Sequence, residues 1–443
     1  MSRKGPIEVE RTTERALLVG LETRASEALH PIDESLAELG RLCETAGAVV
    51  VGSTTQRRNM PDVRTFIGSG KVAEIREMVQ ELCVDLLVFD DPLTPAQQRN
   101  LERVVDPRTF GDPTVRIIDR SQIILDIFAQ RAQSIEGKLQ VELAQLEYLL
   151  PRLTRHWTHL SRQQGGGVGT RGPGETQLEV DRRRLRERVA MLRRRLREVA
   201  RTRDLHRKER AEVPFPTIAL VGYTNAGKST LMNALTGADV LIDDKLFATL
   251  DPTVRRLELK RAGTALLSDT VGFIHKLPHQ LVEAFKSTLE EVRTADLLLH
   301  VVDGSNPERE VHRRVVDEVL EEIDVPDAPT VLVWNKADRL SEADRAGVAH
   351  EVERTGGVLA SAQTGDGLPD VLAAIDTHLA KRAQQVEFWI PFGRGEILAR
   401  VHREGRVLER QDEETGTRVT ALVTHKLAGQ IEKQLGDVVC STP

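Results

Sequence analysis

The chain of 443 residues has few aromatic side chains and few cysteines. Phe, Trp and Tyr together make up only 3% of it, so its cores must be built mainly from aliphatic side chains. The three cysteines, Cys43, Cys83 and Cys440, are widely spaced and match neither a zinc-binding spacing nor a disulfide framework. This pattern suits a reducing cytoplasm.

Long apolar runs are also missing. No stretch approaches the roughly 18 uninterrupted apolar residues of a membrane-spanning helix, and the N-terminus, Met-Ser-Arg-Lys-Gly-Pro, lacks an apolar core for export. We therefore expect a soluble, cytoplasmic, monomeric protein whose contact with membranes is at most peripheral. A chain of this length predicts roughly two to four domains, each large enough for its own core.

A strand-like run, a glycine-rich loop and a helix-like run follow one another at 217–235. Backbone N–H groups of such a loop surround phosphates, Lys228 supplies a charge for the β- and γ-phosphates, and Ser229 supplies a hydroxyl for Mg²⁺. The alternative is a chance glycine-rich turn. The pattern predicts a P-loop nucleotide site made of Gly222, Tyr223, Thr224, Asn225, Ala226, Gly227, Lys228 and Ser229.

The choice of base follows from a second motif, Asn335, Lys336, Ala337 and Asp338, which comes after the apolar run 330–334. A carboxylate at the end of a strand can accept two hydrogen bonds, from the N1–H and the 2-amino group of guanine, and adenine offers no such pair. The motif therefore favours GTP over ATP. The alternative for Asp338 is a helix N-cap before Leu340.

Between these motifs lie Asp269, Thr270, Val271 and Gly272, after the strand-like run 264–268. An Asp at this place can hold Mg²⁺ through water, and the Gly272 N–H can contact the γ-phosphate. Later in the chain, Ser361 and Ala362 follow 358–360 and can back the guanine ring.

The segment 243–253 has the position of a switch loop. Such a loop needs one Thr whose hydroxyl joins the Mg²⁺ shell and whose backbone senses the γ-phosphate. Thr249 and Thr253 both qualify. We prefer Thr249 as the second metal ligand beside Ser229, because it lies in a run that matches the family named below: Phe247, Ala248, Thr249, Leu250 and Asp251.

Phe273 departs from the common GTPase pattern, since Ras-like proteins carry at this place the Gln that orients the attacking water. Intrinsic hydrolysis should therefore be slow, or another group must help. In GTPases with Asn at the place of Asn225, a bound K⁺ can stand in for an arginine finger. The alternative is that Asn225 only braces the loop. The predicted catalytic residues are Lys228, Asn225, Thr249 and Gly272.

The net charge of −6 is unevenly distributed. Residues 152–210 hold 18 Lys and Arg against 7 Asp and Glu, and the remainder carries about −17. A basic segment in an acidic protein points to a polyanion partner. The alternative is the solvated face of a charged coiled coil.

Two stripes of apolar residues with helical spacing flank the Gly-rich segment 163–174, which no helix tolerates. They predict an antiparallel helical hairpin with about 30 residues, or roughly 45 Å, in each arm. The tip, with Arg171, could lie against an RNA backbone; the alternative is a long disordered turn. The stripes are Leu139, Leu143, Leu146, Leu150, Leu153 and Leu185, Val189, Leu192, Leu196, Val199.

Residues 14–119 alternate between strand-like and helix-like runs, which predicts a mostly parallel sheet. The strands are expected at 16–20, 48–51, 86–89 and 115–118, and the helices at 34–46, 71–83 and 95–104. Residues 68–71 look like half a P-loop, but Val72 follows Lys71 and supplies no hydroxyl, so we expect no second nucleotide site. In 384–443, strands are expected at 386–390 and 418–423, and helices at 393–404 and 426–434.

These observations predict an α/β multidomain chain. An N-terminal α/β domain with a parallel sheet takes 1–132, a long antiparallel helical hairpin 133–210, a P-loop GTPase domain 211–383, and a small C-terminal α/β domain 384–443.

The segments 125–132, 172–179 and 222–229 resemble those of the HflX family of bacterial GTPases, and the resemblance spans nearly the whole chain. The motif series over about 213–382 is also similar to that of translation-factor-like GTPases. The HflX resemblance implies a GTPase that binds the large ribosomal subunit and its RNA, and splits or rescues stalled ribosomes under stress. It implies no DNA partner, and a hairpin loop that reaches the peptidyl-transferase region. Some members are credited with ATP use by the N-terminal domain.

Two other classes stay open. One is an RNA-remodelling ATPase that uses the N-terminal domain, and the other is a nucleotide-gated scaffold without turnover. The motif 335–338 argues against the first, and the basic hairpin argues for a polyanion over a purely protein partner.

Overall fold

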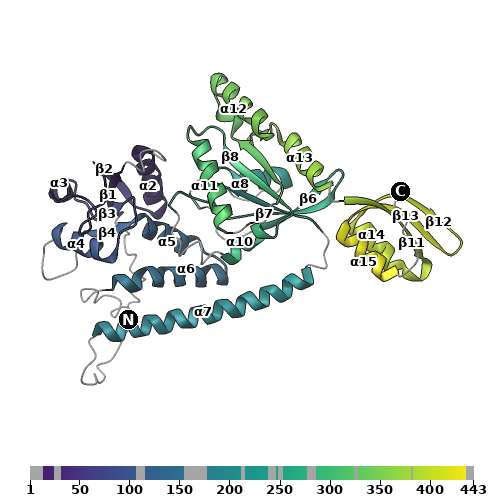
Figure 1. Cartoon of the computed structure of the whole chain (residues 1–443), viewed down its shortest axis with the longest axis horizontal. Helices are drawn as coiled ribbons and strands as arrows, with labels where there is room; N and C mark the ends of the chain where they lie inside the picture. Colours follow the sequence, from purple (N-terminus) through teal and green to yellow (C-terminus); the bar gives the residue numbers. More distant parts are fainter. Residues whose placement is uncertain are drawn as a thin grey trace, which may run out of the picture. The chain divides into compact units, whose positions relative to one another are not determined.

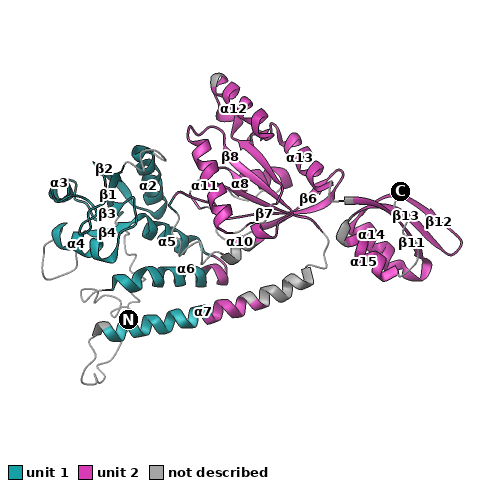
Figure 2. Cartoon of the chain, viewed as in Figure 1, with its two compact units in different colours: residues 1–132, 138–193, 276–284 teal, residues 133–137, 194–275, 285–443 magenta. Residues whose placement is uncertain are grey.

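The computed structural model of the chain describes residues 13–23, 31–105, 115–153, 177–210, 215–237, 246–247, 253–276, 286–323, 325, 328–380 and 383–435. The chain forms two compact units (Figure 2). Unit 1 takes in 1–132, 138–193 and 276–284, and unit 2 takes in 133–137, 194–275 and 285–443.

Unit 1 contains a four-stranded parallel sheet in the order β2-β1-β3-β4 (Figure 1), which confirms the predicted parallel arrangement. Its inner strands are buried on both faces, as parallel strands are, and their side chains form an aliphatic core with those of the helices. The elements are β1 (Arg15–Glu22), α2 (Ile32–Ala46), β2 (Val49–Arg57), α3 (Ser69–Glu81), β3 (Leu86–Phe89), α4 (Pro95–Val105) and β4 (Arg116–Asp119).

Strand β2 is longer than predicted. The sequence shows an apolar run only to Val51, whereas the strand continues to Arg57 through Ser53, Thr54 and Gln56. Because β2 lies at the edge of the sheet, its residues are half-buried or exposed, and the polar ones fit there.

The helical segment contains α5 (Arg120–Arg131), α6 (Ile135–Leu149), the 3₁₀ turn η1 (Leu150–Arg152) and α7 (Gln177–Arg210). Helices α6 and α7 run antiparallel. Arg182 Nη2 donates to the Leu153 carbonyl at the end of η1, and ion pairs join Arg188 to Glu142 and Arg193 to Glu147.

The prediction of two equal arms is wrong, because α6 has 15 residues and α7 has 34. The chain leaves the helix at Ala132, which has an extended backbone, so α5 and α6 are separate helices. Helix α6 also buries Val141, Ala144 and Tyr148, which are not part of the leucine stripe. The tip 163–174 lies outside the described residues.

Unit 2 contains a six-stranded sheet in the order β10-β9-β8-β5-β7-β6, in which only β6 is antiparallel to its neighbour. Its elements are β5 (Thr217–Gly222), α8 (Lys228–Thr236), β6 (Thr253–Leu259), β7 (Gly263–Asp269), α10 (Lys286–Arg293), β8 (Leu297–Asp303), α11 (Arg309–Glu322), β9 (Thr330–Asn335), η2 (Ala337–Arg339), α12 (Glu342–Thr355), β10 (Val358–Leu359) and α13 (Leu368–Ala380).

Helices cover both faces of this sheet. Val301 and Val333 belong to the core under α8 and α13, and the next residues, Val302 and Trp334, pack with Val348 of α12, because successive strand residues point to opposite faces. The carboxyl ends of β5, β7, β8 and β9 lie at one edge of the sheet, where ligands of such folds bind. The motifs 222–229, 269–272 and 335–338 begin at the ends of β5, β7 and β9, and 361–362 comes after β10.

Unit 2 also contains a three-stranded antiparallel sheet in the order β11-β13-β12, packed against two helices. The elements are β11 (Ala383–Pro391), η3 (Phe392–Arg394), α14 (Gly395–Glu404), β12 (Arg406–Asp412), β13 (Gly416–Thr424) and α15 (His425–Leu435). The sequence analysis missed β12, whose run Arg-Val-Leu-Glu-Arg-Gln-Asp is mostly polar because it forms an edge. The domain boundaries stay predictions. Among the described helices, none is long and apolar enough to cross a bilayer.

The C-terminal sheet offers a matched pair of phenylalanines. Phe388 on β11 is fully buried in the core, and Phe392 just after it is 59% exposed. We expect Phe388→Ala to lower the free energy of unfolding of this region by about 3–5 kcal/mol, because it leaves a cavity, and Phe392→Ala to change it by less than about 0.5 kcal/mol. Urea unfolding followed by tryptophan fluorescence measures both. Equal effects of the two substitutions would contradict the described core.

Candidate functional site

The side-chain amide of Asn335 joins three loops at the carboxyl edge of the unit 2 sheet. Its Nδ2 donates to the Ala226 carbonyl (2.9 Å), and its Oδ1 accepts from the Ala362 N–H (3.0 Å). Gly227 has φ +89°, and a Cβ there would lie 2.3 Å from Asn335 Nδ2. The P-loop and the motif 335–338 therefore fit together only because position 227 has no side chain.

Lys228 and Ser229, the last two residues of the P-loop, begin α8. Lys228 is buried, and its Nζ donates to the Gly222 and Tyr223 carbonyls (3.1 and 2.9 Å). Burial lowers the pKa of Lys228 to about 8, although Asp269 acts in the opposite direction. Ser229 Oγ donates to Asp269 Oδ2 (2.6 Å). An ammonium group and two oxygen donors thus lie together at this edge, and oxygen donors are what Mg²⁺ prefers.

Gly272 approaches the P-loop closely. A Cβ at Gly272 would lie 2.9 Å from Thr224 Cα and 3.0 Å from Lys228 Nζ. The next residue fixes this approach, since Phe273 N–H donates to the Gly222 carbonyl (3.1 Å) and Thr224 N–H donates to the Phe273 carbonyl (2.7 Å). The Phe273 ring is buried and presents no polar group that could orient a water molecule.

Tyr223 has a role that the sequence analysis missed. Its ring stacks on His312 of α11, with ring centroids 3.9 Å apart and planes at 6°. Its hydroxyl oxygen accepts a hydrogen bond from the His275 N–H (2.9 Å). Tyr223 thus ties the P-loop to the segment after Gly272. An aromatic residue in an otherwise small-residue loop is the signal that could have indicated this.

Asp338 lies in η2 and is exposed. Ser361 Oγ donates to Asp338 Oδ1 (2.6 Å), which explains why the motif 361–362 accompanies the motif 335–338. The N-cap of α12 is Ser341, whose side chain accepts from the Asp344 N–H. Asp338 therefore does not cap that helix, and its carboxylate accepts the hydrogen bond from Ser361 instead.

The remaining predicted residues divide into two groups. Asn225 is exposed with φ +58°, and its side chain makes no hydrogen bond to another described residue, so the structure gives no support to a bracing role. Phe247 is buried with φ +56°, whereas Ala248, Thr249, Leu250 and Asp251 lie outside the described residues. The metal-ligand role of Thr249 stays a prediction.

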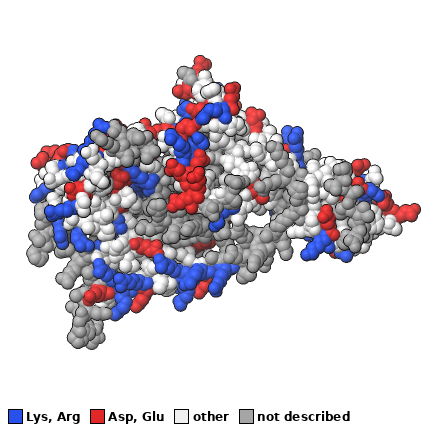
Figure 3. Space-filling model, viewed as in Figure 1, with Lys and Arg blue, Asp and Glu red and all other residues white. Residues whose placement is uncertain are grey.

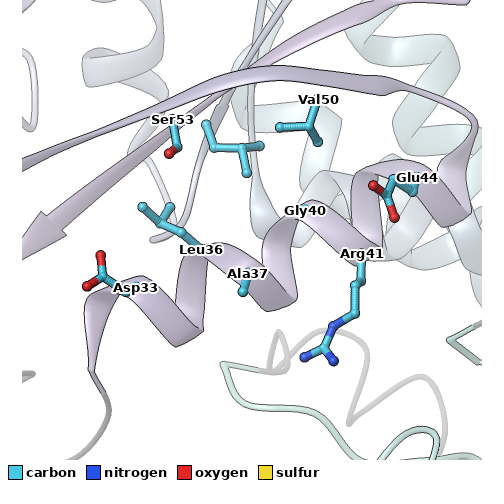
Figure 4. Close-up of a pocket in the computed structure, with 9 residues that line it drawn as sticks. Asp33, Leu36, Ala37, Gly40, Arg41, Glu44, Val50 and Ser53 are labelled. Carbon is cyan, nitrogen blue, oxygen red and sulfur yellow. The ribbon is translucent and has the colours of Figure 1, made fainter.

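In the half P-loop of unit 1, the Gly68 N–H and the Lys71 ammonium group are bound to neighbouring side chains. Gly68 N–H donates to Gln56 Oε1 (2.8 Å), and Lys71 Nζ donates to Thr54 Oγ1 (3.2 Å) and pairs with Glu74 (2.7 Å). A separate hollow of about 340 Å³ lies between α2 and β2, with Leu36 and Val50 facing each other across it and Asp33 and Glu44 near its two ends (Figure 4). Carboxylates at both ends do not suit a phosphate.

Comparisons with known proteins cover almost the whole chain. Residues 33–129 match the family model of the GTP-binding GTPase N-terminal domain, and 131–210 match that of the GTP-binding GTPase middle region. Residues 217–336 match a 50S ribosome-binding GTPase, and 348–442 match the HflX C-terminal domain.

The GTPase HflX of Caldanaerobacter subterraneus is 45% identical over 94% of this chain and 92% of its own length, and that of Escherichia coli is 46% identical over 87% and 88%. A GTP-binding protein of Sulfolobus solfataricus in complex with GDP is 23% identical over 83% of this chain and 99% of its own, with a TM-score of 0.42, too low to carry an argument. On the sequence matches, the chain belongs to the HflX family of GTPases.

Proposed function

We propose that this GTPase binds the large ribosomal subunit and its RNA when GTP is bound, leaves after hydrolysis, and so splits or rescues stalled ribosomes in the cytoplasm under stress. The nucleotide part rests on one observation. The P-loop, Gly272 and Asn335 lie at one sheet edge. The Asn335 amide joins the P-loop to Ala362, and the Phe273 backbone joins Gly272 to the P-loop. The match of 217–336 to a 50S ribosome-binding GTPase supports the partner.

We propose the roles at the nucleotide from this geometry and, for Thr249, from the sequence alone. The P-loop N–H groups and Lys228 receive the phosphates, and Asp338 accepts from N1–H and the 2-amino group of guanine, with Ser361 holding its carboxylate. Residues 361–362 back the base. Ser229 and Thr249 would hold Mg²⁺, with Asp269 acting through water, and the ion would neutralise phosphate charge.

Helix α7 offers a surface for RNA. Its exposed side chains include many arginines, and Figure 3 shows Lys and Arg following one another along it. Arg188 and Arg193 pair with glutamates of α6. Further arginines form a basic row over 183–201 that suits a phosphate backbone. These are Arg183, Arg184, Arg186, Arg194, Arg195, Arg197 and Arg201.

The base specificity can be tested at Asp338. Asp338→Asn replaces one of two acceptors by a donor, which opposes the 2-amino group of guanine and suits the 2-oxo group of xanthine. The affinity for GDP should therefore fall by about 100-fold or more, and xanthosine diphosphate should bind better than GDP. Competition with a fluorescent nucleotide measures both. Asp370→Asn, an exposed change on α13, is the control and should bind GDP normally. Unchanged GDP affinity in Asp338→Asn would refute the assignment.

Asn225 should make turnover depend on K⁺. Since Phe273 supplies no water-orienting group, we expect GTP turnover in K⁺ to exceed that in Na⁺ by about tenfold or more, and Asn225→Ala to remove the difference while leaving GDP affinity within about twofold. Phosphate-release assays at constant ionic strength measure this. Equal rates in both salts for the unsubstituted chain would rule out a K⁺ role.

Binding to the ribosome is tested by co-sedimentation with separated subunits. We expect the chain to pellet with large subunits in the presence of a non-hydrolysable GTP analogue and not with GDP. Deletion of 165–174 should weaken binding. Arg184→Gln with Arg194→Gln should reduce the salt dependence of binding by about one unit of slope for each arginine that no longer neutralises a phosphate.

Two results would argue against this partner. Absence of subunit binding in either nucleotide state would leave a nucleotide-gated scaffold for another partner. RNA-dependent ATP turnover that survives Lys228→Ala would instead favour an ATPase in the N-terminal domain.

A further inference from the structure

Unit 1 buries a cluster of charged side chains at the carboxyl edge of its parallel sheet. Arg120, the first residue of α5 directly after β4, is fully buried and donates to Asp90 Oδ1 (3.1 Å from Nε) and to Glu38 Oε2 (2.6 Å). Asp90, just after β3, is also fully buried and accepts from Ser35 Oγ (2.8 Å). No part of the nucleotide site described above uses this cluster.

Unit 1 also includes Lys276, and this lysine completes the cluster. Its Nζ lies 2.6 Å from Asp90 Oδ2 and 2.5 Å from Asp91 Oδ1. Burial alone would raise the pKa of Asp90, but Arg120 and Lys276 hold it below its usual range, so Asp90 is charged. A buried carboxylate that loses one of two cations is poorly compensated. The position of Lys276 is therefore strongly determined.

Lys276 is only four residues beyond Gly272. A stretch of this length spans at most about 14 Å even when extended, so a displacement at Gly272 must be absorbed by very few backbone bonds. Lys276 itself has φ +58°, an uncommon value for a residue with a side chain. The preceding His275 N–H is held by the Tyr223 hydroxyl. Little slack is therefore present in the backbone between Gly272 and Lys276.

The residue before Arg120 holds the base of the helical hairpin. Asp119 is buried and accepts from the Leu93 N–H (2.9 Å), and Arg152 Nη2 lies 3.4 Å from its Oδ2. Arg152 also donates to the Leu93 carbonyl (2.7 Å), and its guanidinium lies 3.5 Å from the centre of the Tyr148 ring. Arg152 is the last residue of η1, just ahead of the segment that leads to the tip.

We infer that Lys276 and Asp90 couple the nucleotide site to the helical hairpin, by linking the segment after Gly272 through Arg120 and Asp119 to Arg152 at the hairpin base. Asp119 and Arg120 are neighbours in the chain. Arg120 binds Asp90 on the Lys276 side of the link, and Asp119 binds Arg152 on the hairpin side. The state of the nucleotide is thereby passed to the hairpin through ion pairs. The inference rests on the proposed function in that Gly272 senses the γ-phosphate.

The test is hydrogen exchange on the full chain, with GDP and with a non-hydrolysable GTP analogue. In the unsubstituted protein, exchange in 135–153 and 177–193 should differ between the two nucleotides. Lys276→Met, which keeps the aliphatic stem, should abolish that difference while the response of 222–229 and the GDP affinity stay within about twofold of normal. Lys276→Arg should restore it.

Controls separate this link from general loss of structure. Lys71→Met removes another lysine of unit 1 that pairs with a carboxylate, and it should leave the hairpin difference unchanged. If Lys276→Met does not fold, Asp91→Asn tests the same link from the acidic side, because Asp91 is partly exposed. Asp91→Asn should reduce the difference in hairpin exchange between the two nucleotides at least twofold.

Two outcomes would overturn the inference. One is a hairpin difference that persists in both Lys276→Met and Asp91→Asn, and the other is no hairpin difference in the unsubstituted chain although 222–229 responds to the nucleotide. If 222–229 does not respond to the nucleotide either, the proposed nucleotide site itself is wrong. The two failures are thus distinguishable.

Discussion

The nucleotide site depends on one side-chain amide. Asn335 donates to the loop after β5 and accepts from the loop after β10, so loops that are far apart in sequence share one fixed geometry. An aspartate in its place would have no N–H to give the Ala226 carbonyl, and a glutamine would not fit against the bare Cα of Gly227. Lys228, Ser229 and Asp338 are placed relative to one another because this amide is in place.

Much of this site could be predicted from the sequence because its elements are local. A run of apolar residues that ends in Gly222 or Asn335 indicates both the strand and the side of the sheet on which the next residues lie. The parallel sheet of unit 1 was predictable for the same reason, since its inner strands are short, fully apolar runs. The edge strands could not be predicted in full, because β12 and the second half of β2 are polar along most of their length.

Contacts between distant parts of the chain could not be predicted from the sequence. The Asp90–Lys276 pair joins residues 186 positions apart, and neither residue belongs to a recognisable motif. The stacking of Tyr223 on His312 depends on the register of α11 against the P-loop, which no periodicity in the sequence reveals. The hairpin arms are unequal because α6 ends at Leu149 and passes into the short turn η1, although the leucine stripe continues with helical spacing to Leu153.

The buried ring of Phe273 bears on how the cell's nucleotide pool is consumed. A chain without a water-orienting side chain is expected to hold GTP largely intact while it is idle. Consumption would then scale with the number of productive encounters rather than with the number of copies of the protein. Cells could then keep many copies of the protein ready while little GTP is hydrolysed.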